Sequence, residues 1–313
     1  MRHKPRVPKP FITDIDAATR FCAVYGHPIK HSASPAMQNA GIAALGLNWR
    51  YAAFEVHPND LATAIAGAKA MKFIGLNLTV PHKLLAVGMV DVLDVSAKTW
   101  GAVNTIRFET KNKNGDWVPL AQLPGDEINE IRSHGFNTDA DAITRSVQED
   151  LGVELSGASV LLLGAGGAGR VAALKLAAEG VKNLFLVNRT QAKVEEIAAQ
   201  IQRDHPRVNV TVGYPNNSVD LLLNATSLGL NKDDASPLDA NQFSVKDARA
   251  VYDMIYRPVE TPLLSVAKKA GCRTANGIGM LLYQGANALE LWSEKPAPIE
   301  TMRRALEQNV YQK

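Results

Sequence analysis

Residues 159–190 decide the fold of this chain, and they read SVLLLGAGGAGRVAALKLAAEGVKNLFLVNRT. The segment opens on a short apolar run, residues 160–163, of the kind found in a strand buried on both faces. A glycine-rich turn follows, then a helical pattern closed by Gly180, then a second apolar run at residues 184–187. Strand, glycine turn, helix and strand in this order predict the first half of a dinucleotide-binding fold.

The turn carries Gly164, Gly166 and Gly169 at the spacing GxGxxG. One glycine makes the tight turn, one lets the backbone approach a pyrophosphate, and one lets the helix lie close to the sheet. The helix N-terminus offers the phosphates free N–H groups and its positive dipole end. An ordinary glycine-rich turn is the alternative, and the flanking strands and helix argue against it. The loop residues expected to contact the cofactor are Gly164, Ala165, Gly166, Gly167, Ala168 and Gly169.

The end of the second strand indicates which dinucleotide is bound. Sites for NAD normally place an acid there, which accepts hydrogen bonds from the ribose hydroxyls. Here the chain has Asn188, Arg189 and Thr190, with Lys193 three residues on. A guanidinium, a hydroxyl and an ammonium suit a 2′-phosphate, so the pattern favours NADP over NAD. The alternative is that Arg189 and Lys193 are solvated charges at a helix start.

The bulk composition is that of an ordinary globular protein. The 313 residues are 46% hydrophobic and 21% charged, which is enough for two domains. A net charge of +3 is too small to argue for nucleic acid or an anionic membrane as a partner. Cys22 and Cys272 form no CxxC or Cys/His cluster, which excludes a disulfide framework or zinc site and fits a cytoplasmic protein. No apolar run approaches membrane-spanning length, and the basic, proline-rich residues 1–20 read as a loose tail.

Strands and helices alternate along the rest of the chain. Strands are expected at residues 21–25, 50–56, 73–79, 106–109, 208–212, 219–226 and 250–256, and helices at residues 59–71, 195–203, 279–294 and 299–311. This alternation predicts an α/β protein with parallel sheets and crossover helices. Residues 111–133 are expected to form a loop or small hairpin, with a strand at 117–120. The apolar faces of the two terminal helices need a partner, and the economical arrangement packs them back onto the N-terminal domain.

Polar side chains at three places in the first half are candidates for function. Ser34 followed by Pro35 predicts a helix start in which Ser34 supplies the cap. Ser32 is not needed for that cap, and two hydroxyls beside a helix N-terminus suit a small carboxylate. Lys83 lies in the first turn of a helix expected at residues 82–90, where acids are favoured over cations, so it is either functional or simply solvated. Asp139 starts a later helix, where an acid is common without any function.

The carboxyl ends of the strands in an open α/β sheet are where ligands bind. That rule brings eight polar side chains near the interdomain cleft: Ser32, Asn77, Thr79, Lys83, Asn104, Asp139, Asn224 and Tyr256. A hydride that arrives at a ketone carbon leaves an alkoxide, which must be neutralised and protonated. Lys83 can do both, and Asp139 can position it. The uncharged neighbours suit a polyhydroxylated substrate.

Nine motifs in this chain resemble the shikimate/quinate dehydrogenase family, and they occur in the family's order between residues 25 and 292. They are HSASP (31–35), NLTVPHK (77–83), GAVNT (101–105), GFNTD (135–139), GAGGAGR (164–170), NRT (188–190), NATSLG (224–229), YDMIYRP (252–258) and GIGMLLYQGANALELW (277–292). The resemblance implies NADPH-dependent reduction of 3-dehydroshikimate to shikimate, a step of aromatic amino-acid biosynthesis.

The resemblance also implies a role for each candidate residue. Lys83 and Asp139 would form the catalytic pair. The substrate would be bound by Ser32 and Ser34 at its carboxylate, by Thr79, Asn104 and Gln284 at its ring, and by Tyr256 at its edge, with Asn77 as a further substrate-binding residue. The 2′-phosphate would be held by Asn188, Arg189, Thr190 and Lys193, and the rest of the cofactor would lie against the glycine loop, Thr226, Met254 and Gly277.

The fold implied by the resemblance has two α/β domains and no metal site. Residues 21–137 with 278–313 would form the substrate-binding domain, and residues 138–277 the Rossmann-type NADP-binding domain. The implied partner is a small-molecule substrate, with neither nucleic acid nor membrane, in a monomer or homodimer.

Four departures from the family pattern leave substrate preference open. Gln38 stands for the usual histidine, Ala140 for a glycine and Asn276 for an aspartate, and the stretch before Asp139 is longer than is common. That insertion has three interpretations: a surface hairpin, an oligomer contact or a lid over the substrate. One rival function is a quinate/shikimate dehydrogenase of broad specificity. Another is a ligand-sensing homologue without turnover, against which the intact Lys83 and Asp139 argue.

Overall fold

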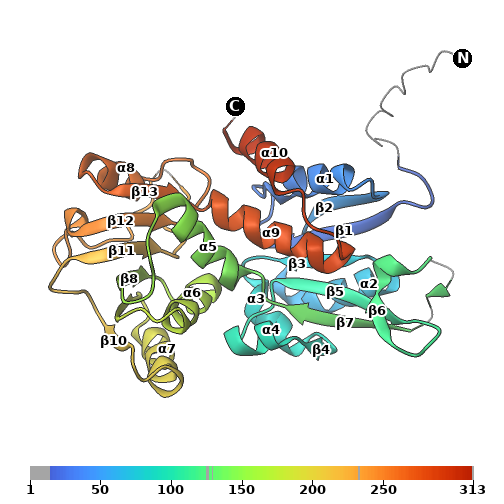
Figure 1. Ribbon diagram of the computed structural model, residues 1–313, viewed down its shortest axis with the longest axis horizontal. Coiled ribbons are helices and arrows are strands. Elements are labelled where there is room, and N and C mark those ends of the chain that lie inside the picture. Colours follow the sequence, from blue (N-terminus) through green and yellow to red (C-terminus); the bar gives the residue numbers. More distant parts are fainter. Residues whose placement is uncertain (1–14, 125–126, 129, 232, 312–313) are drawn as a thin grey trace, which may run out of the picture.

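The computed structural model describes residues 15–124, 127–128, 130–231 and 233–311. Two sheets organise this part of the chain, with helices packed against both (Figure 1). The first sheet has the order β2-β1-β3-β5-β7-β4, with β6 added beside β5, and the second has the order β10-β9-β8-β11-β12-β13. Most of the predicted loose tail lies outside the described residues, and the first strand begins at Arg20.

The first sheet contains the strands of residues 20–136. They are β1 (Arg20–Gly26), β2 (Trp49–Glu55), β3 (Gly75–Leu78), β4 (Val92–Leu93), β5 (Thr105–Lys111), β6 (Trp117–Pro119) and β7 (Ile131–Phe136). The helices of this half are α1 (Ser34–Ala44), α2 (Leu61–Ala70), α3 (His82–Leu85) and α4 (Val95–Trp100). The predicted strands at 21–25, 50–56, 73–79 and 106–109 are confirmed, whereas β4, α4 and β7 were not predicted.

The parallel arrangement expected from the sequence holds for β1, β2 and β3, and β5 is an exception. β5 runs antiparallel to β3, β6 and β7. A tight turn containing Gly115 at φ +86° joins β5 directly to β6, with no helix between them. Strands joined so directly can pair only in the antiparallel sense. The hairpin interpretation of residues 111–133 is therefore confirmed for β5 and β6.

One face of β5 and β7 carries a buried ion cluster around Glu109. Its carboxylate contacts Arg107, lies 2.7 Å from Arg132 Nε and 3.0 Å from His134 Nδ1, and is almost fully buried. Burial by itself raises the pKa of this group, but hydrogen bonds from these three side chains outweigh it and lower the pKa to about 2.

The second sheet is parallel throughout. Its strands are β8 (Ser159–Leu163), β9 (Asn183–Val187), β10 (Asn209–Val212), β11 (Val219–Asn224), β12 (Ala248–Asp253) and β13 (Arg273–Asn276). Its helices are α5 (Asp139–Leu151), α6 (Gly167–Ala178), α7 (Gln191–Asp204) and α8 (Pro262–Lys269). The predicted order of strand, glycine turn, helix and strand over residues 159–190 is confirmed, while α8 and β13 were not predicted.

The two terminal helices, α9 (Ile278–Ser293) and α10 (Ile299–Tyr311), return to the first half of the chain, as predicted. Both pack on α1, and Trp292 of α9 is fully buried against the first sheet. Its indole nitrogen donates to the Ile106 carbonyl at 3.0 Å. The ring fits because the neighbouring residue is Gly75, where a Cβ atom would lie 2.1 Å from that nitrogen.

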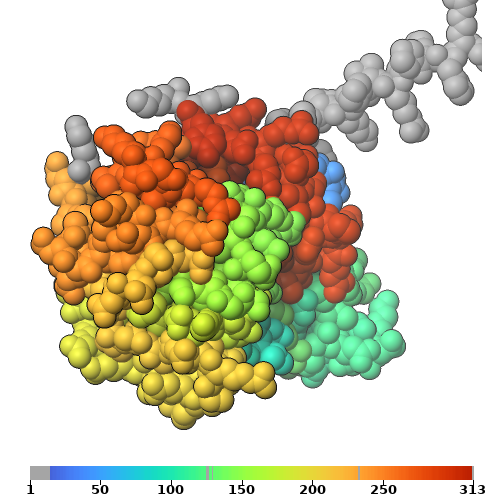
Figure 2. All heavy atoms as spheres, turned by 60° about the vertical axis from the view of Figure 1, so that its left-hand side comes forward, coloured from blue at the N-terminus to red at the C-terminus, as the bar shows by residue number. Residues whose placement is uncertain are grey.

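Helices α5 and α9 pack against each other and join the two halves (Figure 1). On the molecular surface, the green residues of α5 meet the red residues of the terminal helices (Figure 2). A single apolar core runs from Val24 in the first sheet through Ile143 of α5 to Val160 in the second. This shared core fixes the strand ends of the two sheets relative to each other.

Candidate active site

Lys83 and Asp139 form a buried ion pair. Lys83 Nζ lies 2.8 Å from Asp139 Oδ2, and the two side chains are 14% and 1% exposed. Lys83 belongs to α3, a helix of four residues that passes into a 3₁₀ turn at Ala86–Gly88. The longer helix expected here is wrong, and so is the argument that Lys83 stands against a full helix dipole, since one turn carries little dipole. Asp139 is what holds the ammonium.

Local backbone structure brings these two residues together. Lys83 follows β3 after Pro81, and its carbonyl accepts a hydrogen bond from Val103 N–H at 2.9 Å. Asp139 is the first residue of α5, and the N–H groups of Asp139 and Ala140 both donate to Asn137 Oδ1. Asn137 therefore caps this helix, which leaves the Asp139 carboxylate free to pair with Lys83.

The amides of Asn104 and Asn77 are engaged within the protein. Asn104 Nδ2 donates to Asp139 Oδ1 at 2.9 Å, so the second carboxylate oxygen is also bound. Asn77 Oδ1 accepts from the Tyr51 hydroxyl at 2.8 Å, and its Nδ2 donates to Thr105 Oγ1 at 3.0 Å. Burial raises the pKa of Tyr51 well above its ordinary value, so this hydroxyl stays protonated and donates.

The loop before α1 contains Ser32 and Ser34. Ser34 does not cap the helix as expected: it is the first helical residue, and the cap position falls on Ala33, whose backbone is helical at φ −88° and ψ −6°. Instead Ser32 Oγ accepts from Ser34 N–H at 3.3 Å. Tyr256, which follows β12, reaches the same loop, and its hydroxyl lies 3.4 Å from both Ala33 N and His31 O. Tyr256 and the two serines are thus brought together.

Thr79 and Gln284 differ in how they are held. Thr79 is partly buried at the end of β3, and its N–H donates to the Tyr25 carbonyl at 2.9 Å. Gln284 Nε2 donates to Leu281 O at 2.8 Å, so its side chain lies along its own helix. The Gln284 carbonyl accepts from Thr138 Oγ1 at 3.0 Å.

A cavity of about 790 Å³ extends from Lys83 across the glycine loop to the end of β9. Its lining contains most of the predicted cofactor residues: Gly164, Ala165, Gly166, Gly167, Ala168, Asn188, Arg189, Thr190, Lys193 and Thr226. Gly169, Met254 and Gly277 are not part of that lining. Gly277 lies directly against the backbone of Met254: a Cβ atom at Gly277 would be only 2.0 Å from the Met254 carbonyl oxygen.

The three glycines of the loop meet three different steric demands. Gly164 has φ +105°, a conformation that L side chains rarely adopt. A Cβ atom at Gly166 would have no neighbour within 4 Å among the described residues, so the backbone there is open toward the cavity. A Cβ atom at Gly169 would lie 2.3 Å from Gly164 O, which would force α6 away from β8.

Exposed cations lie at the far end of this cavity. Within the described chain, the side chains of Arg189 and Lys193 make no hydrogen bond or ion pair, and both are exposed. Asn188 supports the glycine loop instead, because its Oδ1 accepts from Ala165 N–H at 3.2 Å. Asp239 is the acid in the lining, and it is engaged with Gln242 at 2.9 Å. Two such cations beside an open backbone fit the phosphates of NADP.

Asn224 does not reach a ligand position. It is fully buried, its Oδ1 accepts from Thr226 Oγ1 at 2.8 Å, and its Nδ2 donates to Asp253 at 3.0 Å. Its role is to hold Thr226 at the cavity wall.

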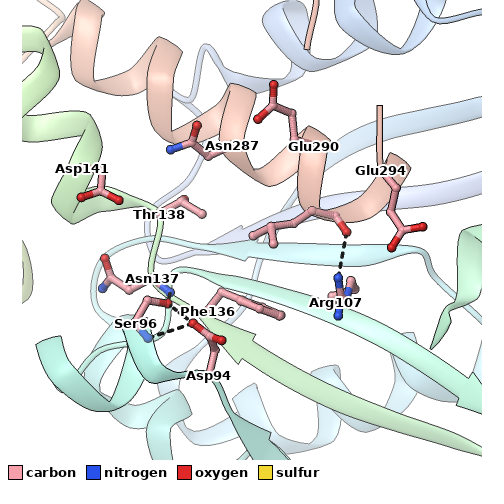
Figure 3. Close-up of a pocket in the computed structure, with 11 residues that line it drawn as sticks. Asp94, Ser96, Arg107, Phe136, Asn137, Thr138, Asp141, Asn287, Glu290 and Glu294 are labelled. Carbon is pink, nitrogen blue, oxygen red and sulfur yellow. Dashed lines mark hydrogen bonds between the residues drawn. The ribbon is translucent and has the colours of Figure 1, made fainter. Parts of the chain in front are cut away.

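A second, shallower cavity of about 510 Å³ lies between the end of β7 and α9 (Figure 3). Asn137 and Thr138 line it together with Asp94 and Ser96 on one side and α9 on the other. Lys83 and Asp139 do not line it. It therefore shares a wall with the active site without opening onto the catalytic groups.

Neither a cluster of metal-binding side chains nor a membrane-spanning helix is present among the described residues. No cluster of three or more His, Cys, Asp or Glu side chains there is arranged to hold a metal ion. No described helix has the length and apolar character that crossing a membrane requires.

Comparison with known proteins gave matches along most of the chain. Three family models match: the shikimate dehydrogenase substrate binding domain at residues 24–106, shikimate/quinate 5-dehydrogenase at 145–227, and the shikimate 5′-dehydrogenase C-terminal domain at 277–307. The shikimate dehydrogenase (NADP(+)) of Geobacter metallireducens is 39% identical over 303 residues, covering 93% of this chain and 97% of the relative. This chain belongs to the shikimate dehydrogenase family.

Solved structures of shikimate dehydrogenases share the two-sheet fold. The shikimate 5-dehydrogenase of Thermus thermophilus, in complex with NADP(H) and shikimate, has a TM-score of 0.76 at 32% identity, over 93% of this chain and 99% of that one. The ligand-free 5-ketofructose reductase of a Gluconobacter strain has a TM-score of 0.75 at 30% identity, over 94% of this chain and 99% of that one. The fold is therefore shared with a reductase named for a different ketone.

Proposed function

We propose that this protein is an NADP-dependent shikimate dehydrogenase, which reduces 3-dehydroshikimate to shikimate in aromatic amino-acid biosynthesis. The observation that carries the proposal is the Lys83–Asp139 pair at the mouth of the cavity that ends on Arg189 and Lys193. The family membership and the NADP and shikimate named for its relatives support the same reaction.

The catalytic pair handles the proton of the reaction. When the substrate carbonyl gains a hydride, its oxygen becomes an alkoxide that must take up a proton. The Lys83 ammonium is the donor, and it stabilises the developing negative charge before the proton moves. Asp139 accepts one hydrogen bond from Lys83 and one from Asn104, so it keeps the ammonium in place. In the oxidation direction, neutral Lys83 takes the hydroxyl proton from shikimate.

The cofactor residues divide by chemistry. NADPH supplies the hydride when bound. We assign its 2′-phosphate to Arg189, Thr190 and Lys193, and its pyrophosphate to the open backbone at residues 164–168. Asn188 and Thr226 shape the wall of that cavity.

We assign the substrate residues from the family resemblance and from the chemistry of their side chains. The hydroxyls of Ser32 and Ser34 suit the carboxylate, with Tyr256 beside them, and Thr79 with Gln284 suits the ring hydroxyls. The side-chain oxygens of Asn77 and Asn104 each accept a hydrogen bond within the protein. An amide oxygen has two lone pairs, so each can still accept a second hydrogen bond, from a substrate hydroxyl.

We place the protein in the cytoplasm, as a monomer or homodimer, with the domain division at residues 137/138 and 277/278. The free, buried thiol of Cys22 suits a reducing compartment.

Replacing Lys83 with methionine tests the site. Lys83→Met should keep NADPH affinity within about threefold and lower kcat for 3-dehydroshikimate by at least about 100-fold, the usual contribution of general acid–base catalysis. Lys98→Met, an exposed lysine of α4, is the matched control and should leave both values unchanged.

A near-normal rate in Lys83→Met would remove Lys83 from the mechanism. A wild-type protein that binds NADPH and turns over none of shikimate, quinate or 5-ketofructose would instead favour the sensing function.

A further inference from the structure

Two buried threonines, Thr105 and Thr138, lie directly behind the catalytic pair. Thr105 is fully buried at the start of β5, and Thr138 lies between the end of β7 and α9 (Figure 3). Their hydroxyl oxygens are 3.2 Å apart. Neither residue has a part in the reaction described above.

The direction of the hydrogen bond at Thr138 follows from its partners. Thr138 Oγ1 lies 3.0 Å from the Gln284 carbonyl, which can only accept, so the single hydroxyl proton points there. The oxygen then accepts from Asn104 Nδ2 at 3.0 Å and from the Thr105 hydroxyl. The Thr138 hydroxyl therefore uses its one donor and both of its acceptor positions only when Thr105 donates to it.

Thr105 is fixed in the same way from its other side. Asn77 Oδ1 accepts from the Tyr51 hydroxyl, so its Nδ2 must face Thr105, where it donates at 3.0 Å. Thr105 then has its own proton left, with Thr138 Oγ1 at 3.2 Å as the nearer acceptor and Asn104 Oδ1 at 3.3 Å as the other. The bonds form one directed chain from Tyr51 on β2 through Asn77, Thr105 and Thr138 to the Gln284 carbonyl on α9.

Asn104 connects this chain to Asp139. Its Oδ1 accepts from the Thr138 backbone N–H at 2.8 Å, and its Nδ2 donates to Asp139 Oδ1 at 2.9 Å and to Thr138 Oγ1. A rotated amide would turn its oxygen toward the buried carboxylate, which is repulsive and costly in this environment. The amide thus occupies Asp139 Oδ1 and leaves Oδ2 for Lys83.

We infer that Thr105 is a positioning residue for the reaction. Through Thr138 and Asn104 it fixes the orientation of the Asp139 carboxylate, and so the place of the Lys83 ammonium that exchanges the proton. This inference rests on the proposed function for its consequence in turnover. Loss of the Thr105 hydroxyl removes the nearer acceptor of Asn77 Nδ2, which keeps only the Asn104 carbonyl at 3.4 Å, and it removes one donor to Thr138, which loosens Asn104.

The test compares Thr105→Val, which keeps the shape and removes the hydroxyl, with Thr105→Ser, which keeps the hydroxyl. Thr110→Val is the matched control, because Thr110 is buried on the same strand and its hydroxyl has no hydrogen-bond partner in the described structure. The measurements are kcat and KM for shikimate, the pH dependence of kcat, and NADPH affinity.

Thr105→Val should lower kcat about tenfold or more, the effect of one lost hydrogen bond in a buried network, and shift the pH profile by at least about half a unit. Thr105→Ser should stay within about threefold of wild type. NADPH affinity should be unchanged in all three variants, and Thr110→Val should match wild type throughout.

Two results would overturn the inference: an unchanged kcat and pH profile in Thr105→Val, or an equal loss in Thr105→Ser, which would make the residue a packing element. If Thr105→Val does not fold, Thr138→Val and Thr138→Ser take the same comparison one bond closer to Asp139.

A second readout needs no turnover. Labelling of Lys83 with acetic anhydride at one fixed pH, read by peptide mass spectrometry, reports how firmly Asp139 holds the Lys83 ammonium. In Thr105→Val this labelling should be at least about threefold faster than in wild type, because the ammonium loses part of its hydrogen-bonded support. An unchanged labelling rate refutes the positioning role even where wild type has no shikimate activity, and that lack of activity refutes the proposed function alone.

Discussion

Replacing Arg189 with alanine tests the proposed site of the 2′-phosphate, the group that distinguishes NADP from NAD. Arg189 is exposed at the cavity rim and has no partner among the described side chains, so the substitution breaks no contact of the free protein. A charge-assisted hydrogen bond to a phosphate contributes about 1.5–3 kcal/mol. Because solvent screens an exposed group, we take the lower half, about 1.5–2 kcal/mol, which corresponds to roughly 10- to 30-fold in affinity.

The assay is the KM for NADP and for NAD with shikimate at saturation, together with direct binding of both cofactors. Arg189→Ala should raise the NADP values by roughly 10- to 30-fold and change the NAD values by less than about threefold. Arg203→Ala, an exposed arginine further along α7 and outside the cavity lining, is the control and should change neither. Equal losses for NADP and NAD in Arg189→Ala would refute the assignment of the 2′-phosphate.

Two further predictions concern stability. The folded pKa of Glu109 is about 2, below its ordinary value, so its contribution to stability is complete above about pH 5 and is lost as pH falls toward 2. This contribution amounts to about 3 kcal/mol. Glu109→Gln should therefore make the free energy of unfolding in urea depend less steeply on pH between about pH 6 and 3. Parallel slopes would contradict the role of the ion cluster. Gly75→Ala should destabilise the fold by more than about 2 kcal/mol because its Cβ atom overlaps Trp292, whereas Gly67→Ala in α2, with open space around it, should be neutral or stabilise by up to about 1 kcal/mol. Similar melting temperatures for these two variants would contradict the packing described for α9.

The nucleotide-binding half could be predicted from sequence because its determinants are local. The apolar run, the glycine spacing and the closing Gly180 all fall within 159–190, and β8, α6 and β9 form there as expected. The return of α9 and α10 was also predictable, since their apolar faces had no partner in the second half.

Strands and helices were missed where the local sequence signal was weak or was not used. β4 has two residues, and β7 carries Arg132 and His134 on the face that holds Glu109, so neither looks like a buried strand. α8, in the second half, is different, because Thr261 followed by Pro262 is a helix-start signal: the threonine hydroxyl accepts from Leu264 N–H. That signal was present in the sequence and could have identified the helix.

The candidate site shows the same division. Lys83 and Asp139 were candidates by their places at strand and helix ends, the family resemblance paired them, and the structure brings them to 2.8 Å. Thr105 and Thr138 could not be singled out, because their value depends on a contact across 33 residues and on which partner supplies each proton. The Ser34 cap was predicted wrongly, since a cap needs extended backbone and the chain is already helical at Ala33.

The most direct test of the central claim is the initial rate of the purified protein with shikimate or quinate, each paired with NADP or NAD. We predict that shikimate with NADP has the highest kcat/KM, at least about tenfold above every other pairing, because two exposed cations that line the cavity suit a 2′-phosphate. Comparable rates with quinate would contradict the substrate assignment. A preference for NAD would contradict the cofactor assignment.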